Sequence, residues 1–161
     1  MEILLAFALC AAPLDVTVIA GQSNAVGSGH VDDLPPGFPL MQEDVLYCEN
    51  TNYVVSSAWG ALAPRPSGAG DPRWYGAELT YGFEAKPGAI IKIARNGTSL
   101  AVDWSPGSSI RQLFQDELNL ALSELQVLGF QPTVTRFLWI QGSGDANSAE
   151  RAYDYRYNLE E

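Results

Sequence analysis

The sequence is poor in residues that bind metals or that pair with anions. It has one histidine, two cysteines without a C-x-x-C spacing, and nine lysines and arginines against 19 aspartates and glutamates. One histidine and two separated cysteines are too few ligands for a structural zinc site. A formal charge of −10 repels phosphate backbones and anionic membrane surfaces, so nucleic acid is not an expected partner. We interpret the scattered acidity as a contribution to solubility.

Long hydrophobic runs are also missing, because no segment reaches the roughly 20 apolar residues of a membrane span. The best candidate, "ILLAFALCAA" at residues 3–12, resembles an export leader but follows Glu2 instead of a cation. Two interpretations of residues 1–12 stay open: a leader removed from a secreted or periplasmic protein, or part of a cytoplasmic one. Cleavage would remove Cys10 and leave Cys48 unpaired, so no disulfide framework is expected.

The composition that is present is typical of one globular domain. The 161 residues are 47% hydrophobic and 17% charged, without an internal repeat or a low-complexity tract. We therefore expect a single domain over residues 13–161, built around one buried core.

Short apolar segments rich in Val and Ile predict strands at residues 14–20 and 88–94, both buried on two faces. Residues 133–140 predict a third strand, and residues 45–48 a shorter one. The first three run into the glycine-containing loops "GQSN", "RNGTS" and "QGSGD". Two Pro- and Gly-rich stretches, residues 30–40 and 63–74, are expected to be irregular surface chain.

Helical spacing predicts helices at residues 75–85, 110–128 and 148–159. The second has an apolar stripe, begins after Ser108 or Ser109 and stops at Gly129, and the third is capped by Asn147 or Ser148. Alternating strands and helices predict a mainly parallel sheet covered on both faces, a three-layer α/β/α sandwich. The three loops then converge at the carboxyl edge of the sheet, where ligands bind in open α/β sheets.

Ser23 stands in the first loop between Gln22 and Asn24. A serine hydroxyl acts as a nucleophile only when a base removes its proton and donors stabilise the oxyanion. The candidate donors are the backbone N–H groups of Ser23 and Gly97 and the side-chain amide of Gln141. By itself, a serine after a strand is more typical of a turn or a helix cap, and that alternative stays open.

Four segments together resemble the SGNH hydrolase superfamily, and within it the sialate O-acetylesterase-like and carbohydrate esterase family 6 acetylesterases. They are "IAGQSNAVG", "YGAEL", "IIKIARNGTSLAVDW" and "LWIQGSGDA", in the family's order and spacing. The resemblance runs from Leu14 onward. It implies a flavodoxin-like α/β/α fold and hydrolysis of O-acetyl groups on sugars, including acetylxylan, through an acyl-serine, with no metal or other cofactor.

By the same resemblance, Ser23 is the nucleophile, Gly97 and Gln141 belong to the oxyanion hole, and Gln22, Asn24 and Asp145 support them. Trp139 and Gly142 would shape the third loop with Asp145. The substrate would be an acetyl ester of a small molecule or a polysaccharide. Trp74 is the candidate substrate wall and Glu78 a candidate pocket residue, although core packing and a surface carboxylate are the alternative interpretations. Arg95 is expected to be solvated or salt-bridged.

The chain departs from the family pattern at three places. Asn96 replaces the first glycine of a usual pair, and Ser143 stands where the motif has a glutamate that can orient the catalytic histidine. The Asp-x-x-His segment that supplies the base in the family is not among these residues. His30, the one histidine, lies too close to Ser23 in sequence to turn back easily onto its hydroxyl, so we interpret it as an exposed loop residue.

Two explanations for the missing base stay open. The sequence is part of a longer, C-terminally incomplete esterase, or it is a degenerate homologue that at most binds acetylated glycan. An apolar face at Tyr153, Tyr157 and Leu159 favours the first. An unrelated flavodoxin-like module is a third alternative, and nucleotide binding is disfavoured because "SNAVGSG" lacks the phosphate-loop ending. The sequon "NGT" at residues 96–98 lies at the expected active-site edge, which disfavours glycosylation.

Overall fold

The computed structural model describes residues 11–52, 55–66 and 72–161. The candidate leader, residues 1–12, lies outside this part except for its last two residues. Ala12 already belongs to the first strand, where it pairs with Phe130.

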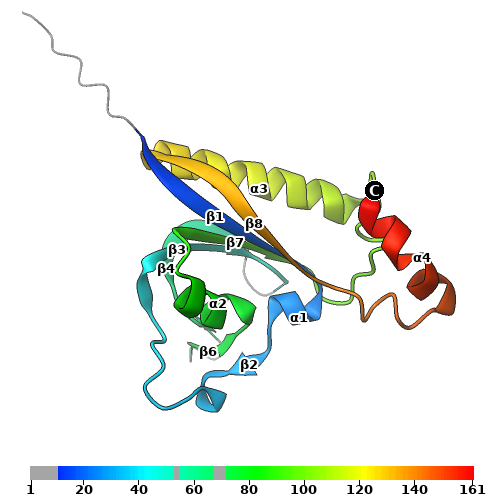
Figure 1. Cartoon of the computed structure of the whole chain (residues 1–161), viewed down its shortest axis with the longest axis horizontal. Helices are drawn as coiled ribbons and strands as arrows, with labels where there is room; N and C mark the ends of the chain where they lie inside the picture. The colour runs from blue at the N-terminus through cyan, green and yellow to red at the C-terminus, as the bar shows by residue number, and fades with distance from the viewer. Residues whose placement is uncertain (1–10, 53–54, 67–71) are drawn as a thin grey trace, which may run out of the picture.

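A five-stranded sheet forms the centre of the fold, in the order β4-β3-β7-β1-β8 (Figure 1). Strands β3, β7, β1 and β8 are parallel to one another, and β4 is antiparallel to β3 at one edge. The strands are β1 (Ala12–Gly21), β3 (Gln42–Asn50), β4 (Val55–Leu62), β7 (Ala89–Ala94) and β8 (Phe130–Ile140). The mainly parallel sheet expected from the sequence is confirmed.

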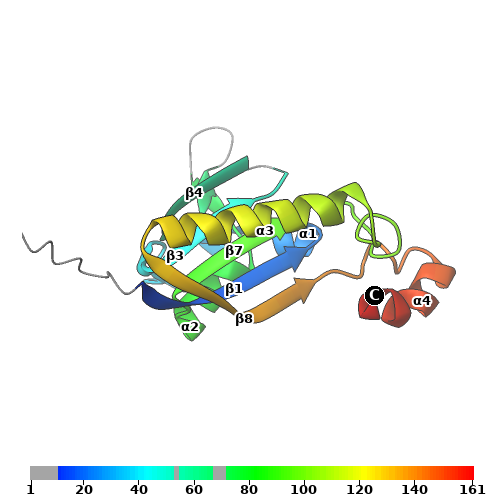
Figure 2. The same ribbon diagram turned by 90° about the horizontal axis from the view of Figure 1, so that it is seen from above.

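Helices cover both faces of the sheet, as Figures 1 and 2 show. Helix α3 (Ser109–Val127) lies along one face, and α1 (Ser23–Val26) and α2 (Ala77–Ala85) lie on the other. Side chains that alternate along a strand point to opposite faces. Accordingly, Ile91 and Ile93 of β7 pack in the layer beneath α3, whereas Ile90 packs in the layer beneath α2. Lys92 follows the same alternation and points to the α2 side.

The predicted helices and main strands are confirmed in position. Helix α3 begins after Ser108, whose hydroxyl accepts a hydrogen bond from the N–H of Arg111, and α4 (Ala149–Glu160) begins after Ser148. Strand β1 is buried on both faces from Val16 onward. Strand β8 instead lies at the outer edge of the described sheet and is largely exposed along its length.

The two Pro- and Gly-rich stretches are not wholly irregular, which corrects the sequence-based expectation. Parts of them form a second, three-stranded sheet of β2 (Gly29–His30), β5 (Arg65–Pro66) and β6 (Pro72–Tyr75). A short 3-10 helix, Val31–Asp33, follows β2. Proline is compatible with these strands because Pro66 lies in the edge strand β5 and Pro72 is the first residue of β6. Residues 67–71 lie outside the described part.

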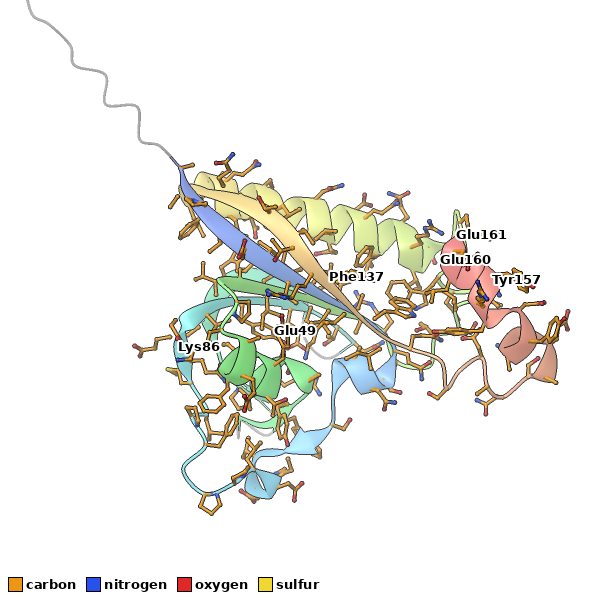
Figure 3. All side chains as sticks on the ribbon, in the orientation of Figure 1. Glu49, Lys86, Phe137, Tyr157, Glu160 and Glu161 are labelled. Carbon is orange, nitrogen blue, oxygen red and sulfur yellow. The ribbon has the colours of Figure 1, made fainter. Side chains whose placement is uncertain are left out.

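The face of α4 that the sequence marks as apolar is exposed. Tyr157 is 64% exposed and Tyr153 80% exposed, and Figure 3 shows Tyr157 on α4, beyond the end of the sheet. Phe137 on β8 is also more than half exposed. Within the described residues, no helix combines the length and the apolar character that crossing a bilayer requires.

Cys48 offers a direct test of the packing between the sheet and α3. Its side chain is buried in β3 against that layer, and burial, followed by the charges of Glu124, Glu117 and Glu49, raises the pKa of its thiol to about 12. Because the thiolate is the reactive form, we expect iodoacetamide at pH 8 to label Cys48 only after denaturation. Mass spectrometry of a Cys10→Ser variant measures this. Rapid labelling in the native state would contradict the buried position.

Candidate active site

The carboxyl ends of three neighbouring strands bring the three glycine-containing loops together. Strand β1 lies between β7 and β8 and is parallel to both, so the loops after Gly21, Ala94 and Ile140 leave the sheet at the same edge. Backbone hydrogen bonds join them at their first residues. The N–H of Arg95 donates to the carbonyl of Gly21 at 3.1 Å, and that of Gln22 donates to the carbonyl of Ile140 at 3.1 Å. The predicted convergence is therefore confirmed.

The side chain of Gln22 ties the first loop to the third. Its Oε1 accepts hydrogen bonds from the backbone N–H of Gly144 at 3.0 Å, from Gln141 Nε2 at 3.1 Å and from the N–H of Gly142 at 3.4 Å. Its Nε2 donates to the hydroxyl of Ser143. Since Gln22 is buried and directly precedes Ser23, these bonds fix the start of helix α1, whose first residue is Ser23.

Asp145 ties the third loop to the second. Its side chain is 0% exposed, and its carboxylate accepts hydrogen bonds from the backbone N–H groups of Leu100 at 2.7 Å and Ala101 at 3.1 Å. It also accepts from Gln141 Nε2 at 2.5 Å. Hydrogen bonds to an ionised acceptor are about twice as strong as those between neutral groups. One buried carboxylate therefore holds both loops.

Gln141 lies at the junction of all three loops. Its Nε2 is within hydrogen-bond distance of Gln22 Oε1, of Asp145 Oδ2 and, at 3.3 Å, of the carbonyl of Thr98. An amide nitrogen has two hydrogens, so both are already engaged. Donation to an oxyanion would require Gln141 to release one of these acceptors. Its expected place in an oxyanion hole stays a prediction.

Gly97 precedes Thr98 and adopts a φ of 73°, a left-handed conformation that favours glycine. No heavy atom lies within 4 Å of the position that a Cβ would occupy there. The loop surface at Gly97 is therefore open, as close approach by a ligand requires. Asn96 does not share the left-handed conformation, and its backbone N–H donates to Asn52 Oδ1. Whether Gly97 donates to an oxyanion stays a prediction.

Ser23 is the first residue of α1 and borders a surface hollow of about 380 Å³. The hollow is lined by Ser23, Asn24, Gly27, Ser28, Gly29, Tyr75, Gly76, Ala77 and Thr80. Two of these lining residues touch through their backbones, because a Cβ on Gly27 would lie 2.2 Å from the Cα of Gly76. The lining is uncharged and rich in hydroxyl and amide groups.

No base contacts the Ser23 hydroxyl among residues 11–52, 55–66 and 72–161, where no hydrogen bond to this hydroxyl is formed. His30 lies in β2 with its Nδ1 3.4 Å from both the backbone nitrogen and Oδ2 of Asp32. Its ring meets Trp74 edge-on with the centroids 5.4 Å apart. The sequence predicts an exposed loop residue, whereas His30 lies in a short strand with its side chain 35% exposed.

The two expected substrate residues do not border the hollow. Trp74 is 38% exposed on β6 beside His30, whereas the next residue, Tyr75, lines the hollow instead. Glu78 is only 3% exposed and forms an ion pair with Lys92, at 2.9 Å from Nζ. The first turn of α2 points the Glu78 side chain into the interior, so the alternative of a surface carboxylate is wrong. The expected roles of Trp74 and Glu78 toward a substrate stay predictions.

Arg95 binds backbone carbonyls instead of a carboxylate. Its guanidinium donates to the carbonyls of Asn50 at 2.8 Å and Ala94 at 2.9 Å, and also to Asn50 Oδ1. Partial burial lowers the pKa of this guanidinium, an effect that Glu117 opposes. The expectation of a solvated or salt-bridged arginine is therefore wrong.

Three buried charges near the site were not expected from the sequence: Glu49, Arg65 and Lys92. A signal for one of them was present. Lys92 is the single charge in the apolar strand "AIIKIA", and a charge inside a buried strand requires a partner. Nothing in the local sequence identifies Glu49 and Arg65 as neighbours of that charge.

Comparisons with known proteins agree with this geometry. A protein-family profile described as "Carbohydrate esterase, sialic acid-specific acetylesterase" matches residues 13–161. A solved structure of a protein from Arabidopsis thaliana is similar with a TM-score of 0.62 and 18% identity, covering 92% of this chain and 65% of that one. The crystal structure of NanS is similar with a TM-score of 0.60 and 15% identity, covering 92% and 63%.

The chain thus spans just under two thirds of the length of each of these structures. At such low identity the likeness shows the α/β fold. The curated proteins contain no match.

Asp145→Asn should loosen the junction of the loops. The new amide would present N–H to donors that now meet a carboxylate oxygen, so we expect a loss of about 1–3 kcal/mol in the free energy of unfolding. Amide exchange at residues 96–104 should also accelerate. Urea unfolding and hydrogen-exchange mass spectrometry measure the two effects. Asp116→Asn, on the exposed side of α3, is the control and should change stability by less than about 0.5 kcal/mol.

Proposed function

This chain belongs to the carbohydrate esterase family of sialic acid-specific acetylesterases, and we propose that it is a serine esterase acting on O-acetylated sugars, with Ser23 as its nucleophile. The observation that carries the proposal is the position of Ser23. It begins a helical turn at the edge where the three loops meet, and it borders an uncharged hollow.

The reaction would proceed in two halves. Ser23 Oγ attacks the carbonyl carbon of the acetyl ester, and the electron pair of the C=O bond moves to the oxygen, which becomes an oxyanion. As this intermediate collapses, the bond to the sugar oxygen breaks, and the sugar leaves as an alcohol after taking up a proton. Water then attacks the acyl-serine and acetate is released. The N–H groups of Ser23 and Gly97 are the donors proposed for the oxyanion.

The proton of the Ser23 hydroxyl must pass to a base. The resemblance assigns this role to an Asp-x-x-His segment, and the one histidine of this chain faces Asp32 and Trp74. This observation favours a second candidate function, in which the chain binds an acetylated sugar in the hollow without turnover. A base added to the solution distinguishes the esterase from the non-catalytic binding protein. It replaces the histidine, so that Ser23 and the oxyanion donors can be tested without it.

Hydrolysis of 4-nitrophenyl acetate should depend on Ser23 when imidazole is supplied as the base. After subtraction of the protein-free reaction, in which imidazole itself attacks the ester, we expect the imidazole-dependent rate of the wild-type chain to exceed that of Ser23→Ala by at least about 10-fold, because the variant lacks the proposed nucleophile. Mass spectrometry should find the acetyl group on the peptide that contains Ser23. A His30→Ala variant with wild-type rates would show that His30 is not the base.

Equal rates for the wild type and Ser23→Ala, with and without imidazole, would contradict an esterase. Binding of an O-acetylated sugar by calorimetry in that same protein would then support the non-catalytic function.

The dependence of kcat/KM on ionic strength should distinguish a negatively charged acetylated sugar from a neutral one. A sialic acid carries a carboxylate and approaches a chain of net charge −10, whereas a neutral acetylated sugar has no such repulsion. Salt screens repulsion over a Debye length of about 10 Å at 0.1 M. We expect kcat/KM for an O-acetylated sialic acid to rise between 20 and 200 mM salt, and that for an acetylated xyloside to stay constant. A falling value for the sialic acid would indicate a local cationic subsite instead.

A further inference from the structure

Four charged side chains from four segments meet in one buried cluster beneath α1 and α2. They are Glu49 of β3, Arg65 of β5, Glu78 of α2 and Lys92 of β7. Lys92 Nζ lies 2.9 Å from Glu78 Oε1 and 3.4 Å from Glu49 Oε1, and Arg65 Nη1 lies 3.3 Å from that same Glu49 oxygen. Figure 3 shows Glu49 on the side of the sheet that faces α2. Within residues 11–52, 55–66 and 72–161, these ion pairs of the cluster join two charges of each sign.

Stability alone does not account for such a cluster. Removing an ion from water costs several kcal/mol, and apolar replacements of buried ion pairs are often neutral or stabilising. Lys92 is 1% exposed in a strand whose other side chains are apolar, where a methionine or leucine would suit the core. The contacts of Lys92 and Arg65 with groups other than the carboxylates indicate a second role.

Both cations also hold the carboxyl end of α1. Lys92 Nζ donates to the carbonyl of Val26 at 3.1 Å, and Arg65 Nη1 donates to this same carbonyl at 3.2 Å. Arg65 Nη2 donates to the carbonyl of Gly27. Cations are favourable at the C-terminal end of a helix, where the carbonyls have no partner within the helix. Helix α1 thus receives external hydrogen bonds from two buried charges.

Helix α1, which these two cations hold, carries Ser23, the proposed nucleophile. Helix α1 consists of four residues from Ser23 to Val26, and the N–H of Gly27 donates to the carbonyl of Ser23 at 2.9 Å. Isolated helices shorter than about 12 residues are marginal in water, so a single turn takes its orientation from outside contacts. Gln22 fixes its beginning, and the charged cluster fixes its end.

Glu78 extends the same cluster to the opposite wall of the hollow. Its Oε1 accepts a hydrogen bond from the N–H of Gly76 at 2.8 Å while it pairs with Lys92. Gly76 and Gly27 touch through their backbones, so a Cβ on Gly27 would lie 2.2 Å from the Cα of Gly76. Both sides of the hollow therefore rest on one ion pair.

We infer that Lys92 is a positioning residue for Ser23, acting with Arg65 through the carbonyls of Val26 and Gly27; this inference rests on the proposed esterase function. Lys92 does not touch the substrate. It holds α1 so that the Ser23 hydroxyl and backbone N–H keep a fixed direction toward the hollow. Its removal together with Glu78→Gln, whose amide oxygen can still accept the N–H of Gly76, should lower kcat and leave KM nearly unchanged, because the Gly76 side of the hollow and its uncharged lining are then retained.

The test compares two charge-balanced double variants. Lys92→Met with Glu78→Gln removes the ion pair and the donor to Val26, and leaves Glu49 and Arg65 paired. Lys92→Gln with Glu78→Gln is equally neutral but retains an amide donor toward Val26. Tyr47→Phe is the matched control, because the Tyr47 hydroxyl donates to Glu49 Oε2 at 2.8 Å and belongs to the cluster without contacting α1.

We expect the methionine variant to lose between about 10-fold and 100-fold in the Ser23-dependent kcat, with KM within about twofold, since small misplacements of a reacting group have effects of this size. Amide exchange at residues 23–27 should accelerate in this variant. The glutamine variant should recover most of both losses, and Tyr47→Phe should show neither. Circular dichroism verifies that each protein is folded.

Unchanged exchange at residues 23–27 in a folded methionine variant would overturn the inference. Faster exchange at residues 23–27 with an unaltered kcat in the methionine variant would also overturn it. Equal losses of kcat in the methionine and glutamine variants would do the same. If the wild type shows no Ser23-dependent hydrolysis, the proposed function fails by itself. The exchange comparison then still decides whether the cluster holds α1. Should the methionine variant not fold, Arg65→Lys, which removes the Nη2 donor to the carbonyl of Gly27, takes its place: we expect a lower Ser23-dependent kcat and faster exchange at residues 23–27 than in Tyr47→Phe, and unchanged values would overturn the inference.

Discussion

The parallel pairing of β1 with two neighbours is the constraint on which the rest of the site depends. Strands β7 and β8 are distant in sequence, yet each forms a parallel ladder with β1. Parallel strands must end at a common edge, so three loops that contain the chemistry-bearing residues cannot avoid meeting. Moving any one strand by a residue would turn its loop toward the other face, since side chains alternate along a strand.

Two different kinds of interaction then hold the loops at that edge. On the side of the third loop, the contacts are hydrogen bonds from backbone N–H groups to the side chains of Gln22 and Asp145. On the side of α2, the contacts run from the cations of Arg65 and Lys92 to carbonyls of α1. The first kind satisfies donors and the second satisfies acceptors. The satisfied donors belong to the second and third loops and the satisfied acceptors are the carbonyls of Val26 and Gly27, in line with the usual pairing of buried polar groups.

The fold was largely predictable because its signals are local. Continuous apolar segments identified β1 and β7, and the stripe of α3 with Ser108 before it identified the long helix. The small sheet of β2, β5 and β6 was missed because proline and glycine mark turns more often than strands. Its strands are two to four residues long, too short for any alternation to be visible.

The site was predictable only where a loop follows a recognisable strand. Ser23, Gly97, Gln141 and Asp145 follow β1, β7 and β8, and the structure brings their loops together. The burial of Glu78 was not predictable, because a helix of nine residues does not define which of its polar side chains faces inward. Glu49 and Arg65 meet Lys92 only through tertiary packing, and such contacts leave no trace in local sequence.

The contact between Gly27 and Gly76 has a consequence for how substrate preference can change in this protein. A side chain on Gly27 would meet backbone atoms of Gly76 and Tyr75, which no compensating substitution can shorten. A side chain on Gly76 would meet Glu78 Oε2 as well as the Cα of Gly27. The lining can therefore be reshaped at residues such as Ser28, Tyr75 and Thr80, whereas Gly27 must stay a glycine as long as the two backbones touch.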